Sequence, residues 1–417
     1  MPVKMYAAPL AVAALTLTPA TVPLHAQQAQ QARQAITVVL PAPGGPHPVG
    51  TVALRLVDRS RRDPLVRSKP YRELMVSLWY PAKSGTQPLA PHMAPLAAAD
   101  WDRHSAPPMG IAKGAVDWAA TRTAARSGAP VERGAGRLPV VLFGSGDGGP
   151  RTLGTTLVQD LASRGYLVVT VDHTYEADQV EFPGGRVVRA LPLPAKLTPR
   201  VIKALLERHA RARLADMRFV LDQVTALGQG RAIGGEDMPA GLRGAPDLTR
   251  VGALGQSLGG SVAAQLVHDD PRVDAGANLD GGYVGPVAAT GVTRPFLQLA
   301  AQTHTRENEP SWKSFWRAST GWKRELRFKG AAHGSFTDLQ ALLPQIAAAL
   351  PKAGDGKQDG RQGGVPVADF VGTIDPQRSV AAQRAYVGAF FDLHLLGKPT
   401  RLFQEPDSRF PEVSRIP

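Results

Sequence analysis

The sequence predicts an α/β fold with a mostly parallel central sheet and helices on both faces. One observation is the continuous apolar run Leu138–Phe143, because strands buried on both faces lack the usual alternation of apolar and polar residues. A second is the alternation of such runs with helical patterns from there to the C-terminus. A third is the pair of glycine-rich turns, at 144–149 and 255–260, that directly follow two of these runs. We therefore expect a single α/β domain over residues 41–417.

The region before this alternation has a different residue pattern. Residues Thr51–Val57 and Arg72–Tyr80 carry β-branched and aromatic residues in short runs, which favours an opening antiparallel pair of strands. The stretch 81–136 is rich in Pro and Ala, so we expect an irregular insertion with one or two short helices.

The remaining elements follow from periodicity and from turn residues. Further strands are predicted at Tyr166–Val171, Arg250–Leu254, Ala275–Leu279, Pro295–Ala300 and Glu325–Phe328. Helices are predicted at Thr152–Arg164, Val201–Leu227, Leu258–His268 and Ser379–Leu396. The segment 351–364 is rich in Gly, Lys and Asp and is predicted to be an exposed loop insertion.

Residues 1–26 have the pattern of an export signal. Lys4 supplies a positive start, Ala7–Leu17 is an uncharged apolar core, and Ala26 is a small residue suited to cleavage. The apolar core is too short to span a bilayer stably. We expect an exported protein, periplasmic or secreted, that is soluble after removal of the signal and begins with a flexible segment at 27–40.

The composition excludes several classes of function. The 417 residues include 48 Lys and Arg, 35 Asp and Glu, and no cysteine, for a net charge of +13. Without cysteine there are no disulfides, thiolate metal sites or cysteine nucleophiles. The basic residues are scattered, so we expect no nucleic-acid partner and at most peripheral contact with an anionic lipid surface.

The strongest local motif is Gly255-x-Ser257-x-Gly259. It lies between the predicted strand Arg250–Leu254 and the helix that begins at Leu258. This is the setting of a nucleophile elbow, in which a tight turn presents the serine hydroxyl above the sheet. Ser257 is therefore the predicted nucleophile.

A serine nucleophile needs an adjacent base. Sites in open α/β sheets form beyond the C-terminal ends of the strands, where His173, His304 and His333 are placed. In enzymes with this elbow the histidine comes last in the chain, after the acid. His333, in a glycine-bounded turn after the last predicted strand, fits this order best. His304 is the second candidate, and His173 is interpreted as a structural histidine.

The acid must orient the imidazole and stabilise its protonated form. Asp280 ends the strand Ala275–Leu279 and precedes two glycines, whereas Glu307 follows the next strand. Position alone leaves both open, with Asp280 slightly favoured.

The oxyanion hole requires two backbone N–H groups. One is predicted from Leu258, which follows the nucleophile, and the other from Asp147 in the glycine-rich turn 144–149. That turn lacks the Gly-Lys-Ser/Thr ending of a phosphate loop and the later acid of a dinucleotide site. We accordingly expect no metal and no organic cofactor.

These segments resemble the plasma-type (form II) platelet-activating-factor acetylhydrolase family of α/β-hydrolases, in particular its secreted bacterial members. The resemblance runs from about Pro41 to the C-terminus. It rests on Leu74–Pro81, Phe143–Gly148, Leu161–Tyr166, Val171–His173, Gly255–Gly260, Asn278–Gly281 and Gly330–Phe336. The interval between Ser257 and Asp280 agrees with the family pattern, so the resemblance assigns the acid to Asp280. It implies calcium-independent hydrolysis of short or oxidised acyl esters, such as phospholipids like platelet-activating factor.

Two positions depart from the family pattern. The family commonly has Ser-His-Gly in the oxyanion loop, where this chain has Ser145-Gly146-Asp147. It also commonly has a histidine before the nucleophile, where this chain has Gln256. Backbone donors survive both changes, but the shape and polarity of the acyl pocket are expected to differ.

The sequence thus predicts an exported serine ester hydrolase that works through an acyl-enzyme. Within the enzymes, the alternative is a lipase or a cutinase-like polyester hydrolase on the same fold. The alternative of another class is an inactive hydrolase fold that serves as a binding protein. The sequence leaves the oligomeric state open.

Overall fold

The computed structural model describes residues 35–132, 134, 136–235, 237–350, 365–404 and 407–417. The predicted export signal and the predicted loop 351–364 lie outside the described residues. Residues Ile36–Pro417 form one compact unit.

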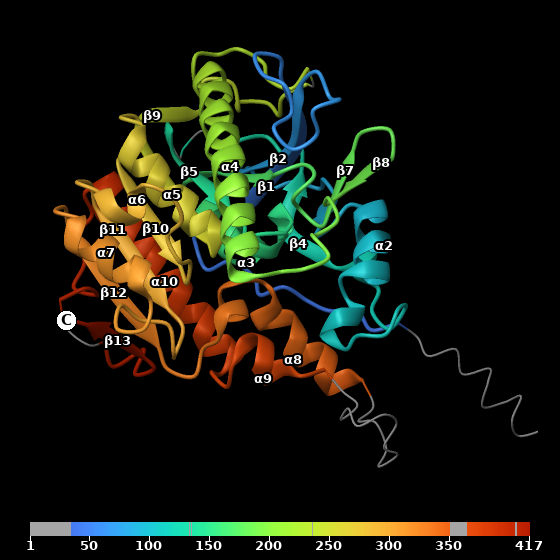
Figure 1. Ribbon diagram of the computed structural model, residues 1–417. Helices are drawn as coiled ribbons and strands as arrows, with labels where there is room; N and C mark the ends of the chain where they lie inside the picture. Colours follow the sequence, from blue (N-terminus) through green and yellow to red (C-terminus); the bar gives the residue numbers. More distant parts are fainter. Residues whose placement is uncertain (1–34, 133, 135, 236, 351–364, 405–406) are drawn as a thin grey trace, which may run out of the picture. The chain divides into compact units, whose positions relative to one another are not determined.

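Six parallel strands occupy the middle of a sheet to which eleven strands of the described residues contribute (Figure 1). Their spatial order is β6-β5-β9-β10-β11-β12. Their bounds are β5 Leu138–Gly144, β6 Leu167–Asp172, β9 Pro246–Gln256, β10 Ala275–Leu279, β11 Phe296–Ala300 and β12 Lys323–Phe328. Each overlaps one of the predicted strands, so the mostly parallel α/β fold is confirmed.

Antiparallel strands extend the sheet at both edges. The predicted opening pair is present as β1 (Val49–Asp58) and β2 (Arg72–Pro81), and β2 pairs antiparallel with β6. At the other edge β13 (Val413–Ile416) pairs antiparallel with β12.

The prediction that residues 81–136 are irregular apart from helices was wrong in one respect. The stretch contains the helix α2 (Pro95–His104), but also the strands β3 (Leu89–Pro91) and β4 (Arg122–Ser127). β4 pairs in parallel with β1 over three residues and antiparallel with β3. Its sequence, Arg-Thr-Ala-Ala-Arg-Ser, has no apolar run, because it lies near the sheet edge, and so gave no strand signal.

Helices cover both faces of the sheet. Along β5, Leu142 packs on the face covered by α4 (Pro199–Gly228) and α5 (Leu258–Asp269). Its neighbours Val141 and Phe143 pack on the opposite face, against α3 (Thr155–Ser163) and α10 (Pro376–Leu396). Two shorter helices, α6 (Val287–Thr290) and α7 (Pro310–Ala318), join the α4 and α5 face. This two-sided burial explains the continuous apolar runs of the central strands.

A third apolar cluster joins segments that are far apart in the sequence. Trp101 of α2 and Ile346 of α8 (Leu339–Ala349) belong to it, together with Val38 and Leu40. Residues Ile36–Leu40, placed in the predicted flexible segment, are therefore part of the compact unit. Their short apolar run was not recognised as core because its partners come from the insertion and from the C-terminal third of the chain.

The remaining elements are short. The hairpin β7 (Gln179–Phe182) and β8 (Arg186–Arg189) lies beside α2 (Figure 1). The other elements are α9 (Val367–Val371) and the 3₁₀ turns Pro107–Met109, Trp118–Ala120, Arg151–Gly154 and His333–Phe336. Within the described ranges, every helix is too short or too polar to span a bilayer.

Candidate active site

Ser257 stands at the sharp turn between β9 and α5. Its φ of 53° and ψ of −124° lie outside the regions that side-chain-bearing residues normally occupy. Such strain persists only where the surrounding structure imposes it, and it clusters at functional sites. The Ser257 N–H donates to the Leu279 carbonyl (2.9 Å), which ties the turn to the end of β10.

The two motif glycines are required by close packing of backbones. A Cβ atom on Gly259 would overlap the carbonyl oxygen of Gly144 at the end of β5, and one on Gly255 would overlap the backbone of Gly259. The first turn of α5 can therefore approach β5 and β9 only if both positions lack a side chain. This approach brings the serine beside the glycine-rich loop that follows β5.

His333 and Asp280 are in direct contact. The His333 Nδ1 lies 2.7 Å from Asp280 Oδ2, so the neutral imidazole donates its Nδ1 proton and keeps the Nε2 lone pair available. Asp280 is 1% exposed and has a φ of 58° at the end of β10, whereas the His333 side chain is 54% exposed. Glu307, the alternative acid in the sequence, is exposed at the surface.

Gln256 occupies the free side of the His333 ring. Its Nε2 lies 3.2 Å from His333 Nε2 and donates to it when Nδ1 carries the imidazole proton. Among the described residues, the Ser257 hydroxyl makes no hydrogen bond, so Ser257 and His333 are not hydrogen-bonded to each other in this conformation. Catalytic hydrogen bonds that are open in a free enzyme often close when substrate binds.

A second histidine shares the Asp280 carboxylate. His304 Nδ1 lies 3.1 Å from Asp280 Oδ1, which also accepts the Ala301 N–H at 2.7 Å. Burial by itself would raise the pKa of Asp280, but hydrogen bonds from His304 and His333 outweigh it and lower the pKa below its usual value. Asp280 is therefore ionised at neutral pH.

The loop 144–149 is held from behind by a buried ion-pair cluster. Arg213, fully buried on α4, donates to the carbonyl oxygens of Ser145 and Gly146 and to both Glu176 carboxylate oxygens. In a trans peptide the carbonyl and the next N–H point in opposite directions. The N–H groups of Gly146 and Asp147 consequently point away from Arg213. Neither the Asp147 N–H nor the Leu258 N–H has an acceptor among the described residues.

The Asp147 side chain joins the same cluster. Its Oδ1 lies 2.7 Å from His209 Nδ1. Burial would raise the pKa of Asp147, but the His209 hydrogen bond and the Arg213 charge outweigh it and lower the pKa to about 2. Asp147, Glu176 and His209 each offer one possible metal-ligand atom, and these three atoms lie within 4.8 Å of one another, a spacing that could hold a cation. Arg213 already pairs with Glu176 and brings a positive charge to this cluster.

A cavity of about 330 Å³ opens beside Ser257 and His333. Its apolar wall is formed by Phe143, Leu153, Leu339 and Phe370. Two carboxylates, Asp147 and Asp369, also line it. The cavity is therefore small, largely apolar, and acidic at two points.

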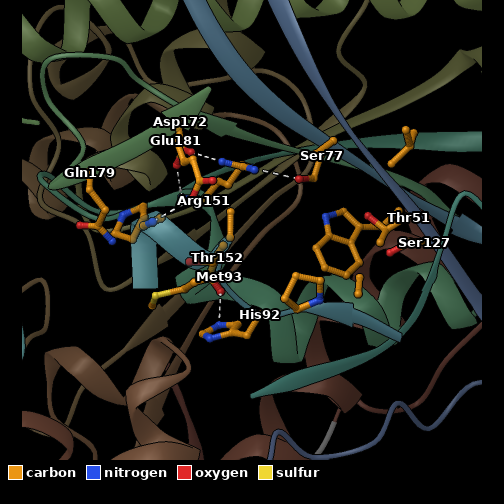
Figure 2. Close-up of a pocket in the computed structure, with 18 of the residues that line it drawn as sticks. Thr51, Ser77, His92, Met93, Ser127, Arg151, Thr152, Asp172, Gln179 and Glu181 are labelled. Carbon is orange, nitrogen blue, oxygen red and sulfur yellow. Dashed lines mark hydrogen bonds and ion pairs between the residues drawn. The ribbon is translucent and has the colours of Figure 1, made fainter. Parts of the chain in front are cut away.

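A second cavity, of about 250 Å³, is lined by Pro150, Arg151 and Thr152, which lie in sequence between Gly149 and Leu153 of the first cavity's wall. Figure 2 shows Arg151 in this cavity, between Ser77 on β2 and Asp172 at the end of β6. Arg151 makes two contacts with Asp172. Its guanidinium forms an ion pair with the carboxylate, and its backbone N–H donates to Asp172 Oδ1 at 2.5 Å. These contacts anchor the chain directly after the loop 144–149.

The sequence candidates divide clearly in space. Ser257, Leu258, Asp280, His333 and Asp147 meet at the C-terminal ends of β5, β9 and β10 and in the loop after β12. His173 instead donates to Asp216 (2.8 Å) in a buried network with Arg72. Sequence reasoning missed the contact of Gln256 with His333, the second contact of Asp280 and the support from Arg213. These depend on tertiary packing, although His304 was noted as following a strand end.

A parallel sheet with a strained serine between strand and helix, and a His–Asp pair beside it, defines the class of the α/β-hydrolases. Comparison with known proteins gives the family. The chain belongs to the platelet-activating factor acetylhydrolase, isoform II, family, whose model matches residues 34–363.

The relatives are esterases. A probable 1-alkyl-2-acetylglycerophosphocholine esterase of Arthroderma benhamiae is 30% identical over 399 residues, which is 90% of this chain and 93% of the relative. Among solved structures, the ferulic acid esterase from Streptomyces cinnamoneus is 35% identical, with a TM-score of 0.72 over 91% of this chain and 99% of that one. The protein is accordingly a serine ester hydrolase.

Proposed function

We propose that Ser257, His333 and Asp280 form the catalytic triad of a carboxylic-ester hydrolase that acts on short acyl groups. The observation that carries this proposal is the 2.7 Å contact of His333 Nδ1 with the buried Asp280, next to a serine held in a strained strand–helix turn. The contact assigns the Nδ1 proton to the Asp280 side, which leaves His333 Nε2 as the base.

The reaction proceeds in two halves. Ser257 Oγ attacks the ester carbonyl and gives its proton to His333 Nε2, while Asp280 stabilises the imidazolium. The negative charge of the tetrahedral intermediate is received by the N–H groups of Leu258 and Asp147. His333 then protonates the leaving alcohol as the acyl-enzyme forms. In the second half, water attacks the acyl-enzyme and gives a proton to His333. The acid is then released, and His333 returns the proton to Ser257 Oγ.

The cavity supports a small acyl group. Its 330 Å³ lies near the lower end of the range of about 300–1,000 Å³ found for ligand pockets. The names of the relatives indicate two candidate substrates: a 2-acetyl phospholipid, whose acyl group is small, and an ester of ferulic acid, whose acyl group is larger and aromatic. The phospholipid is the first candidate because the family model matches most of the chain. The ferulic acid ester is the second, because its esterase matches at higher identity.

The test compares wild type, Ser257→Ala and the matched exposed control Ser414→Ala on p-nitrophenyl acetate, butyrate and palmitate. We expect the highest kcat/KM on acetate, a loss of more than about 10⁴-fold in Ser257→Ala, and wild-type rates in the control. A palmitate optimum would indicate a lipase, and a preference for polymer surfaces a cutinase-like enzyme. Activity that survives in Ser257→Ala would overturn the triad.

The natural substrate and the compartment need separate measurements. Parallel assays with a 2-acetyl phospholipid and with methyl ferulate distinguish the two candidates by kcat/KM. We also propose that the protein is exported, on the basis of the signal pattern in residues 1–26. N-terminal sequencing of the protein from the periplasm or medium should find a chain that begins at Gln27.

A further inference from the structure

Both oxygens of the Asp280 carboxylate accept hydrogen bonds. Oδ2 faces His333, while Oδ1 receives both the Ala301 N–H and His304 Nδ1. The triad acid thus has two imidazole partners, one on each oxygen. A Ser-His-Asp mechanism requires only one of them.

His304 is held firmly in this place. Its ring stacks on the Trp312 ring with a centroid distance of 4.2 Å and an interplanar angle of 26°. Trp312 is completely buried on α7 and donates Nε1–H to the Gly281 carbonyl at 2.6 Å, directly after the triad acid. The contact between His304 and Asp280 is therefore fixed by the same element that supports the Asp280 loop.

The far side of the His304 ring faces negative charge. His304 Nε2 lies 3.6 Å from Glu309 Oε2, at the start of α7. Nε2 is thus directed at Glu309, which is unfavourable geometry for a base that must reach Ser257. The other charged groups around it are Asp280, Glu325 on β12 and Arg306, which lies 2.5 Å from Glu325.

Burial by itself would lower the pKa of His304. Its hydrogen bond to Asp280 and the charges of Asp280 and Glu309 outweigh that effect, and the pKa is raised above the usual 6.5. His304 consequently carries a positive charge in part of the molecules at neutral pH and in more of them as the pH falls.

We propose that His304 is a positioning residue that tunes the triad through Asp280. Its Nδ1–H occupies Oδ1, so that Oδ2 remains directed at His333. Once protonated, its charge compensates part of the Asp280 charge, which then stabilises the His333 imidazolium less. The proposed enzyme therefore keeps its kcat/KM to lower pH than it would with one imidazole partner on Asp280. His304 exchanges no proton with the substrate. This inference rests on the proposed function of Ser257, His333 and Asp280.

The test is the pH dependence of kcat/KM for p-nitrophenyl acetate in wild type, His304→Gln and the exposed control His268→Gln. Glutamine keeps an N–H donor for Asp280 but never carries the charge. We expect the midpoint of the acidic limb to move up by about 0.5–1 pH unit in His304→Gln. At pH 8 we expect a loss of less than about tenfold, since the hydrogen bond is kept. The control should follow wild type at every pH.

Each other result overturns the proposal. A lower melting temperature with an unchanged pH profile would show that His304 is only structural. A loss as large as that of Ser257→Ala would identify His304 as the base. If His304→Gln does not fold, NMR titration of the histidines in the wild type decides. His304 must then titrate above 6.5 and His333 must show a second, coupled step over the same range. Independent titrations of His304 and His333 would contradict the proposal. The proposed triad is tested separately, by the activity of Ser257→Ala.

Discussion

At the scale of single residues, the site is organised around the hydrogen bonds of one imidazole. His333 Nδ1 is committed to Asp280, and His333 Nε2 receives the Gln256 side-chain amide at 3.2 Å. The lone pair that takes the Ser257 proton in the proposed reaction is therefore occupied in the free enzyme. Substrate binding has to release that amide before the proposed reaction starts.

Replacement of Gln256 tests this interpretation. A net hydrogen bond is worth about 1 kcal/mol, which corresponds to about fivefold in rate. We expect Gln256→Leu to react with a fluorophosphonate up to about fivefold faster than wild type at pH 8, because no amide has to leave His333. The second-order labelling rate measures this. A tenfold slower reaction would show instead that Gln256 orients His333, to whose carbonyl its amide also points at 3.5 Å.

At the scale of elements, α4 supports the loop 144–149 without lining the cavity. Arg213 donates to two carbonyls of the loop, and Glu176, which follows β6, holds the guanidinium. The direction of the loop N–H groups thus depends on a helix that begins far away in sequence. An oxyanion hole built from backbone depends on such external supports.

Arg213→Lys tests that support, since a lysine keeps the charge but cannot reach Glu176 and both carbonyls together. We expect kcat on p-nitrophenyl acetate to fall about 10–100-fold with little change in KM, because an oxyanion donor acts mainly in the transition state. The matched control is Arg218→Lys on the exposed side of α4, paired with Asp269. A rise in KM at unchanged kcat would contradict the role in the oxyanion hole.

The predictable elements are those whose burial leaves a local signature. Leu138–Phe143 and Ala275–Leu279 could be predicted because burial on both faces requires continuous apolar runs. The sharp turn at Ser257 could be predicted because it requires glycines at 255 and 259. β4 and β13 are short and polar at the sheet edges, and only their pairing partners define them. Asp280 contacts His304, and Arg213 contacts the loop 144–149. Both contacts join residues far apart in sequence, so no local sequence pattern predicts them.

At the scale of the whole molecule, two histidines have surroundings that shift their pKa values in opposite directions. His304 faces carboxylates, and its pKa is raised. His394 on α10 instead lies between the rings of Trp322 (4.5 Å) and Phe390 (5.0 Å). Its Nε2 is buried without a hydrogen-bond partner among the described residues. Burial lowers the pKa of His394 from 6.5 to about 4.

This lowered pKa should make stability depend on pH. Because the folded pKa lies below the unfolded one, the unfolded chain binds the proton more readily, and the contribution of His394 to stability is lost as the pH falls from about 6.5 to 4. His394→Phe keeps an aromatic ring in the pocket but cannot titrate. We therefore expect the difference in melting temperature, His394→Phe minus wild type, to increase by about 1–3 °C when the pH is lowered from 7 to 4.5.

Comparison with the wild type cancels other titrating groups such as Asp280, which are present in both proteins. His268→Phe, at an exposed position on α5, shows what loss of a surface histidine does over the same range. A constant difference from wild type for His394→Phe would show that His394 is protonated equally in the folded and unfolded chains. The aromatic pocket around it would then admit enough water to solvate the charge, contrary to the packing of Trp322 and Phe390 against its ring.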